Sequence, residues 1–144
     1  MSMREKGFTL FELLVSISII AILTAMVSLS YSVAQKKARD TKRRQDMEAV
    51  QKAAEQFYSL SGDYSYPAGT TVADWTVNGE ALLNLFPTDP KGEDYEAYSE
   101  NFGTDTSQYC VCATVENSSN GNAEVNDCSA FASSGAYFCV KNQQ

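Results

Sequence analysis

One stretch of the chain is too apolar to lie on the surface of a soluble protein. From Phe8 to Leu29, 22 residues, the only ionisable side chain is Glu12. Coiled as an α-helix, this run would extend about 33 Å, which is enough to cross the hydrocarbon core of a bilayer. An unpartnered carboxylate in such a helix costs about 2.5–3.5 kcal/mol on insertion scales. The run therefore predicts a membrane-spanning helix in which Glu12 needs a partner.

Positive charge precedes this apolar run. Arg4 and Lys6 lie within the first seven residues, and positive charge favours the cytoplasmic side of a membrane. We therefore expect the residues after the run to lie on the outer side. An ordinary signal peptide would end in an Ala-x-Ala-like cleavage site, which the sequence Ser28-Leu29-Ser30 fits poorly.

The residues around the start of the run form a recognisable motif. The sequence Lys6-Gly7-Phe8-Thr9-Leu10-Phe11-Glu12-Leu13-Leu14-Val15 resembles the prepilin cleavage motif of type IV pilins and type II secretion pseudopilins. This resemblance implies that a prepilin peptidase cuts between Gly7 and Phe8 and methylates the new amino terminus. Glu12 then becomes the fifth residue of the mature chain, where the family has its glutamate.

Cleavage at this position would also provide the partner that Glu12 lacks. The cut exposes an α-amine at Phe8, and an amine beside a carboxylate is attracted far more strongly in a low dielectric than in water. In a filament the amine would come from a neighbouring subunit and would fix the axial register. Within one chain, Phe8 and Glu12 are spaced i and i+4, so an internal contact is also allowed. A plain signal anchor is the alternative to a prepilin segment.

The helix is expected to continue far beyond the apolar run. Neither Gly nor Pro occurs between Gly7 and Gly62, so the sequence predicts one helix from Phe8 to Ser61 with Gly62 as its C′ cap. Its second half is amphipathic, with a narrow apolar stripe formed by Met47, Val50, Ala54, Phe57 and Leu60.

These signals divide the chain into four segments. Residues 1–7 form a leader, 8–30 a transmembrane or filament-core helix, 31–62 the amphipathic half of the helix, and 63–144 a globular head. The head is acidic, with 12 Asp and Glu residues from Asp63 onward against only Lys91 and Lys141.

A basic collar precedes this head. Six of the nine residues between positions 36 and 44 are basic, namely Lys36, Lys37, Arg39, Lys42, Arg43 and Arg44. We interpret the collar as a helix face that contacts anionic lipid before assembly and the acidic heads of neighbours afterwards. The alternative is a phosphate-binding patch for DNA.

The sequence of the head predicts a small β-sheet. Strands are expected at 95–100, 108–116 and 136–141, and a short helix at 79–85. Alternation places one set of side chains toward the stripe of the long helix: Tyr109, Val111, Ala113 and Val115 from the second strand, with Ala136, Phe138 and Val140 from the third. The predicted fold is therefore α+β and pilin-like, with a long helix packed against about three antiparallel strands.

Four cysteines lie in the last third of the chain. An even count after an export segment favours disulfides over zinc, and the CxC spacing is not that of a zinc site. Cys110 and Cys112 share one strand face and are poorly placed to bond each other. We prefer Cys110 with Cys139 and Cys112 with Cys128, because both loops then stay short. The pairing of Cys112 with Cys139 remains open.

Two further segments in the head carry weaker signals. The sequence Phe86-Pro87-Thr88-Asp89-Pro90-Lys91-Gly92 resembles the Pro-x-Asp-Pro-x-Gly turn of major pseudopilins and some pilins. The loop 117–127 is rich in oxygen ligands but lacks EF-hand spacing. We expect no cofactor and no metal, with calcium in this loop, as in some pseudopilins, as the alternative.

The chain contains no histidine, and its remaining Asp, Glu and Cys show no arrangement of nucleophile and base, so we expect no catalytic residues and no enzyme. The expected function is structural: a subunit of a type IV pilus-like filament that polymerises with copies of itself. It would reside in the cytoplasmic membrane, be assembled by inner-membrane machinery, and end in an extracellular filament. A secretion pseudopilin, and a minor pilin that binds DNA or a surface, are the alternatives. The cysteines favour a pilus, whereas the Asp89-Pro90 turn favours a pseudopilin.

Overall fold

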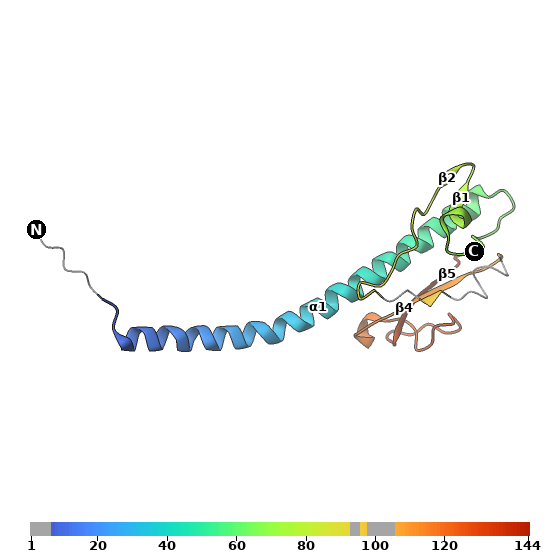
Figure 1. Cartoon of the computed structure of the whole chain (residues 1–144). Helices are drawn as coiled ribbons and strands as arrows, with labels where there is room; N and C mark the ends of the chain where they lie inside the picture. The colour runs from blue at the N-terminus through green and yellow to red at the C-terminus, as the bar shows by residue number, and fades with distance from the viewer. Residues whose placement is uncertain (1–6, 93–95, 98–105) are drawn as a thin grey trace, which may run out of the picture. The chain divides into compact units, whose positions relative to one another are not determined.

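The computed structural model describes residues 7–92, 96–97 and 106–144. The chain divides into two compact units, one up to Gln35 and one from Lys36 to Gln144. A single long helix, α1 (Leu10–Leu60), contributes to both units. In the second unit, the sheet that contains β4 (Cys110–Thr114) and β5 (Tyr137–Lys141) lies beside the C-terminal part of α1 (Figure 1).

Helix α1 begins two residues later and ends one residue earlier than the sequence predicts. Phe8 and Thr9 lie outside the helix, because the Thr9 side chain caps it by accepting a hydrogen bond from the Glu12 amide. At the other end, Gly62 has a φ of +79°, in the left-handed region that glycine adopts without steric penalty. The predicted role of Gly62 in ending the helix is therefore confirmed.

The predicted three-stranded antiparallel sheet is present, and the α+β class is confirmed. Strands β3 (Glu96–Ala97), β4 (Cys110–Thr114) and β5 (Tyr137–Lys141) pair in the order β3-β4-β5. The second and third strands match their predicted positions. Of the first predicted strand, residues 96–97 are described, and 95 and 98–100 lie outside the described residues.

The prediction of a short helix at 79–85 is wrong. A two-stranded hairpin of β1 (Thr76–Val77) and β2 (Glu80–Ala81) begins this segment, preceded by the 3-10 helix η1 (Val72–Trp75). Asn78 and Gly79 connect the strands with φ angles of 53° and 82°. Two left-handed residues in a two-residue loop suit the twist of a hairpin, and Asn-Gly is the sequence that adopts them most readily.

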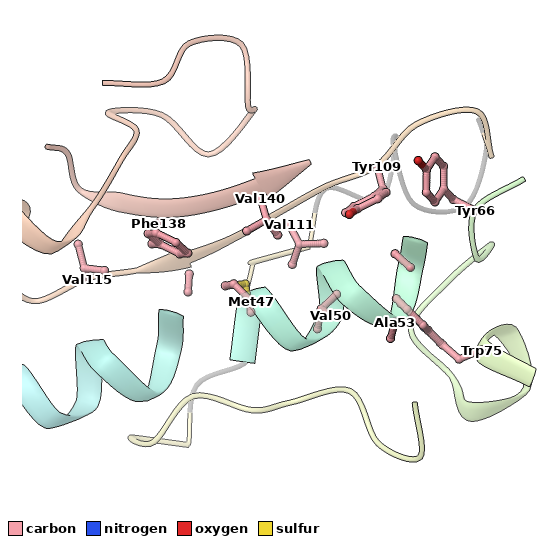
Figure 2. Packing of buried hydrophobic residues seen from close by; sticks show 12 residues of the cluster. Met47, Val50, Ala53, Tyr66, Trp75, Tyr109, Val111, Val115, Phe138 and Val140 are labelled. Carbon is pink, nitrogen blue, oxygen red and sulfur yellow. The ribbon is translucent and has the colours of Figure 1, made fainter. Parts of the chain in front are cut away.

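The core lies between α1 and one face of the sheet. Met47, Val50 and Ala54 are fully buried and belong to one hydrophobic cluster with Val111 and Val140 of β4 and β5. Figure 2 shows Met47 beside Val111. The predicted core face is confirmed for the second strand and for Phe138 and Val140 of the third, whereas Ala136, also predicted to face the core, is exposed and precedes β5. The helix stripe differs in detail: Phe57 is only half-buried and Leu60 is exposed, while Ala53 and Tyr58 join the cluster. Two further buried aromatic side chains, Tyr66 and Trp75, extend the core beyond the sheet.

The outer edge of β5 is covered by a loop. Ala123 and Tyr137 form an antiparallel bridge, with both backbone N–H···O distances equal to 3.0 Å. The Asn122 side chain continues this pairing: its Oδ1 accepts from the Cys139 amide at 2.7 Å, and its Nδ2 donates to the Cys139 carbonyl at 2.9 Å. An amide side chain therefore takes the place of the next residue of a neighbouring strand.

The disulfides correct the preferred pairing. Cys110 bonds Cys128, and Cys112 bonds Cys139. The strand register explains this result, because Cys112 lies directly opposite Cys139, with Cα atoms 4.1 Å apart, whereas Cys110 lies opposite Lys141. The preferred pairing needed Cys110 opposite Cys139, which is two residues out of register. All four sulfurs lie in one buried cluster on the outer face of the sheet.

Candidate functional site

The described residues at the predicted cleavage site are exposed. Gly7, Phe8 and Thr9 adopt no helical or strand structure, and the Phe8 side chain is 85% exposed. Among the described residues, no atom would lie within 4 Å of a side-chain Cβ placed on Gly7. The Gly7–Phe8 peptide bond is therefore open to a protease active site.

Glu12 is held by the residue that precedes the helix. Its carboxylate accepts hydrogen bonds from the Thr9 amide at 2.9 Å and from the Thr9 hydroxyl at 2.8 Å, while its own amide donates to the Thr9 hydroxyl at 3.2 Å. This reciprocal arrangement is a capping box, which satisfies amides that the first helical turn leaves unpaired. Because residues 1–7 are still attached, the Phe8 nitrogen is an uncharged peptide amide. The predicted pair between Glu12 and the Phe8 amine stays a prediction for the processed chain.

The first unit presents an apolar surface on all sides of the helix. Side chains such as Phe11 and Ile20 are 74% and 59% exposed, and the most apolar 18-residue window of α1 has no buried residue. By length and composition the helix could cross a membrane. Its hydroxyl groups donate back to the carbonyl four residues earlier, as Ser16 does to Glu12 and Ser28 to Thr24, each at 2.8 Å. These polar groups therefore need no water, which suits an apolar environment.

Most of the basic collar is engaged within the second unit. Arg39 forms an ion pair with Glu116, Lys42 with Asp46, and the Arg44 guanidinium lies 4.8 Å from the centre of the Phe138 ring. Within the part of the chain that the structure describes, the two collar residues without an ion-pair or aromatic partner are Lys36 and Lys37.

Arg43 is the collar residue that the sequence interpretation placed least well. It was expected on a solvated or phosphate-binding face, but only 3% of it is exposed. Its Nε and Nη2 bind both carboxylate oxygens of Asp89, the second at 2.9 Å, and its Nη1 donates to Asp40 at 2.9 Å and to Glu116 at 3.2 Å. These four side chains form what we call the Arg43 cluster.

Asp40 connects this cluster to the sheet. It is completely buried, and its carboxylate accepts hydrogen bonds from the backbone amides of Glu116 at 2.8 Å and Asn117 at 3.0 Å, and from the Asn120 side chain at 2.9 Å. The segment directly after β4 is therefore anchored to α1. Asp89 anchors the turn 86–92 in the same way, through Arg43.

The charges in the cluster stabilise one another. The Arg39 hydrogen bond is the main cause that lowers the pKa of Glu116 to about 2, and the Arg43 hydrogen bond lowers the pKa of Asp89. Burial alone would raise the pKa of Asp40, but the hydrogen bonds that it accepts outweigh burial and lower the pKa. All three carboxylates are therefore ionised at neutral pH, as their basic partners require.

Of the three acidic members of the cluster, Asp89 was noted in the sequence only as part of the Pro-x-Asp-Pro turn, and Asp40 and Glu116 were not singled out. A signal for Asp40 was available, because it is the one acidic residue inside the basic collar. The turn around Asp89 is present, with the Gly92 amide donating to the Asp89 carbonyl at 2.7 Å and a φ of +83° at Gly92.

The oxygen-rich loop uses several of its groups internally. Asn117 Oδ1 accepts from the Ser119 amide at 3.1 Å, Asn122 pairs with β5, and Asp127 Oδ1 accepts from the Ser129 amide at 2.9 Å. These contacts hold the shape of the loop. Calcium binding in this loop stays an untested alternative.

One comparison with known proteins bears on the leader segment. Residues 2–28 match the family model of the prokaryotic N-terminal methylation motif. This motif is the leader signature of type IV pilins and pseudopilins, so the resemblance of the sequence around Gly7 to a prepilin segment is confirmed. The motif indicates a structural protein and implies processing by a prepilin peptidase. Comparison of the chain with curated proteins and with solved structures gave no match.

Proposed function

We propose that this chain is a structural subunit of a type IV pilus-like filament. One observation carries the proposal: the methylation motif leads directly into a helix whose apolar side chains are exposed on every side. A prepilin peptidase would cut after Gly7 and methylate the amine of Phe8. The helix would remain in the cytoplasmic membrane until assembly machinery there moves it into an extracellular filament, where copies of the same helix replace the lipid.

The driving force for polymerisation comes from the same helix. When the helix moves from lipid into a bundle of identical helices, its backbone polar groups and its hydroxyl groups stay hydrogen-bonded within the helix. The transfer therefore leaves none of these groups unpaired. Glu12 is the exception, since its carboxylate is satisfied only by Thr9 in the single chain. A neighbour's α-amine would neutralise Glu12, and its reach would set the axial step between subunits.

The test is filament formation by a Glu12→Gln variant. Leaving one partner of a buried charge pair alone costs about 2–5 kcal/mol, so we expect at least about a 30-fold loss of sheared filament. Glu48→Gln, which removes an exposed carboxylate from the same helix, is the matched control and should assemble normally. Intact-mass analysis of both variants should show a chain that begins at methylated Phe8. Wild-type filament yield from processed Glu12→Gln protein would refute the proposal.

A pseudopilin of a secretion system is the second candidate, and the Asp89 turn favours it. This turn resembles that of major pseudopilins, and the structure shows it fixed to α1 by the Arg43 pair. Deletion of the encoding sequence distinguishes the two roles. Loss of surface filaments with normal protein secretion indicates a pilus subunit, whereas loss of secretion without loss of surface filaments indicates a pseudopilin.

A further inference from the structure

The two disulfides of the head have different surroundings. Cys112 and Cys139 are both strand residues, with exposures of 0% and 1%, and they join β4 directly to β5. Cys128 lies outside the strands, in the loop that covers the outer face, and is 8% exposed. Cys110 and Cys128 both line a surface pocket of about 280 Å³. Cys139 lines another pocket, of about 760 Å³, but its partner Cys112 lines neither of these two pockets. The Cys110–Cys128 bridge is therefore the one whose two residues border the same solvent-open pocket, although Cys110 itself is only 1% exposed.

The backbone at Cys128 adds a second difference. Its φ of +52° lies in the left-handed region, which residues with a Cβ atom adopt at an energetic disadvantage. The bridge to Cys110 is one of the contacts that hold this conformation. Once the bridge is open, the loop residue can return to an ordinary backbone conformation. Neither Cys112 nor Cys139 has a positive φ.

A third difference is the cation opposite Cys110. Lys141 is the direct cross-strand partner of Cys110, so the two side chains lie on the same face of the sheet, and both line the pocket. The Lys141 ammonium lies 5.2 Å from the centre of the Phe131 ring. A nearby ammonium stabilises a thiolate, and a more stable thiolate is a better leaving group in disulfide exchange.

We propose that Cys110–Cys128 is a thiol-exchange site, which a dithiol opens while Cys112–Cys139 remains closed. One thiolate of the dithiol attacks Cys128 Sγ in the pocket, the Sγ–Sγ bond breaks, and Cys110 leaves as a thiolate beside Lys141. The second thiol of the reagent then attacks the mixed disulfide and releases Cys128. The dithiol loses two electrons and becomes a disulfide, and its two protons pass to the thiols of Cys110 and Cys128.

The head can undergo this reaction without unfolding. The Cys112–Cys139 bridge and the paired backbones of β4 and β5 are separate from the site. The covering loop keeps other contacts, including the Ala123–Tyr137 bridge and the bond from the Gly135 amide to the Ser118 carbonyl at 2.9 Å. The segment released by exchange is therefore the part of the loop around Cys128.

The test is a reduction time course on the full chain in detergent micelles. Dithiothreitol is added without denaturant, samples are quenched with iodoacetamide, and peptide mass spectrometry measures the labelling of each cysteine. We expect Cys110 and Cys128 to be labelled together, about tenfold faster or more than Cys112 and Cys139. Equal rates at all four cysteines, as global unfolding would give, or faster opening through Cys139, would overturn the proposal.

Two lysine variants test the role assigned to the cation. Lys141→Gln should slow the opening of Cys110–Cys128 by about threefold, because the departing thiolate loses its positive neighbour. Lys52→Gln removes the same charge from an exposed position on α1 and should leave the rate unchanged. Near-ultraviolet circular dichroism should show the same folded head in both variants. Identical opening rates in the two variants would refute the assignment of Lys141.

Discussion

The two units of the chain differ in where their apolar side chains lie and in how their polar groups find hydrogen-bond partners. In the unit that ends at Gln35, large apolar side chains from Phe8 to Val33 are exposed, and the hydroxyl groups bond within their own helix. In the unit from Lys36 onward, apolar side chains form a core, and charges are paired across elements far apart in sequence. Among the described residues, every buried side-chain nitrogen and oxygen has a hydrogen-bond partner.

This contrast shows which unit depends on other molecules. The head unit contains its own core and its own counter-ions, so its stability should be a property of one chain. The apolar helix gains little by folding in water, because burial is the main source of stability and none of its most apolar window is buried. Its apolar side chains therefore need an environment that other molecules provide, which would be lipid and, in the proposed filament, copies of the same helix. Four experiments can break or sharpen this distinction.

The largest effect is expected from Arg43→Ala. The substitution leaves Asp40 and Asp89 buried without their cation, and breaking a buried pair in this way costs about 3–5 kcal/mol. Urea unfolding followed by near-ultraviolet circular dichroism should show a much lower midpoint. Lys37→Ala, which removes an exposed collar cation, should leave the midpoint unchanged. Equal midpoints for the two variants would mean that the cluster does not stabilise the head.

The next largest effect is expected from shortening an apolar side chain, and it is tested by one such substitution in each unit. Met47→Ala opens a cavity in the head core, which should lower the free energy of unfolding by about 2–5 kcal/mol. Ile20→Ala shortens an exposed side chain and should change head stability by less than about 0.5 kcal/mol. If the proposed filament forms, the order reverses for assembly yield. A large loss of head stability in Ile20→Ala would contradict the separation of the units.

Acid should weaken the head through its carboxylates. The folded pKa of Glu116, about 2, and those of Asp40 and Asp89 are lowered, so the stability that they provide is complete above their unfolded pKa values. It is lost as the pH falls from about 5 toward 2. Unfolding midpoints over this range should decline, and Glu116→Gln should be less stable at neutral pH but decline less steeply. A decline as steep as that of the parent would show that Glu116 is not among the titrating groups.

The smallest effect concerns the hairpin turn. Gly79→Ala places a side chain at a φ of +82° and should destabilise the head by about 1 kcal/mol. Asn78→Gly is the matched control, since glycine accepts the φ of 53° at that position and should be nearly neutral. Thermal unfolding resolves such a difference. Equal melting temperatures would indicate that this hairpin contributes little to the stability of the head.

Periodicity predicted most of the fold. A long gap without Gly or Pro gave the helix to within two residues at each end, and strand alternation placed Val111 and Val140 on the core face. The pair Asn78-Gly79 is a readable hairpin signal, which the prediction of a short helix at 79–85 did not use. Alternation also placed Cys110, Cys112 and Cys139 on one face, but a face does not determine a register, and the register decides the pairing of cysteines.

The leader motif of the candidate site could be predicted from the sequence, whereas the Arg43 cluster could not, and the difference has a physical reason. The leader motif is local in sequence, so Gly7, Phe8 and Glu12 could be read directly, and the family model matches the same residues. The Arg43 cluster is assembled from residues 46 and 73 positions apart, and composition alone describes its arginine as one of six surface-type charges. Only the packed head reveals which of these charges are buried.

The covered margin of β5 has a consequence for crowding. Identical domains held side by side at high local density tend to join their sheets wherever a strand presents free amides and carbonyls. Here the Asn122 side chain and the Ala123 backbone already occupy those groups at Tyr137 and Cys139. Copies that meet at this edge find its backbone hydrogen-bonding groups already paired. They can therefore make contact through side chains and separate again without exchanging strands.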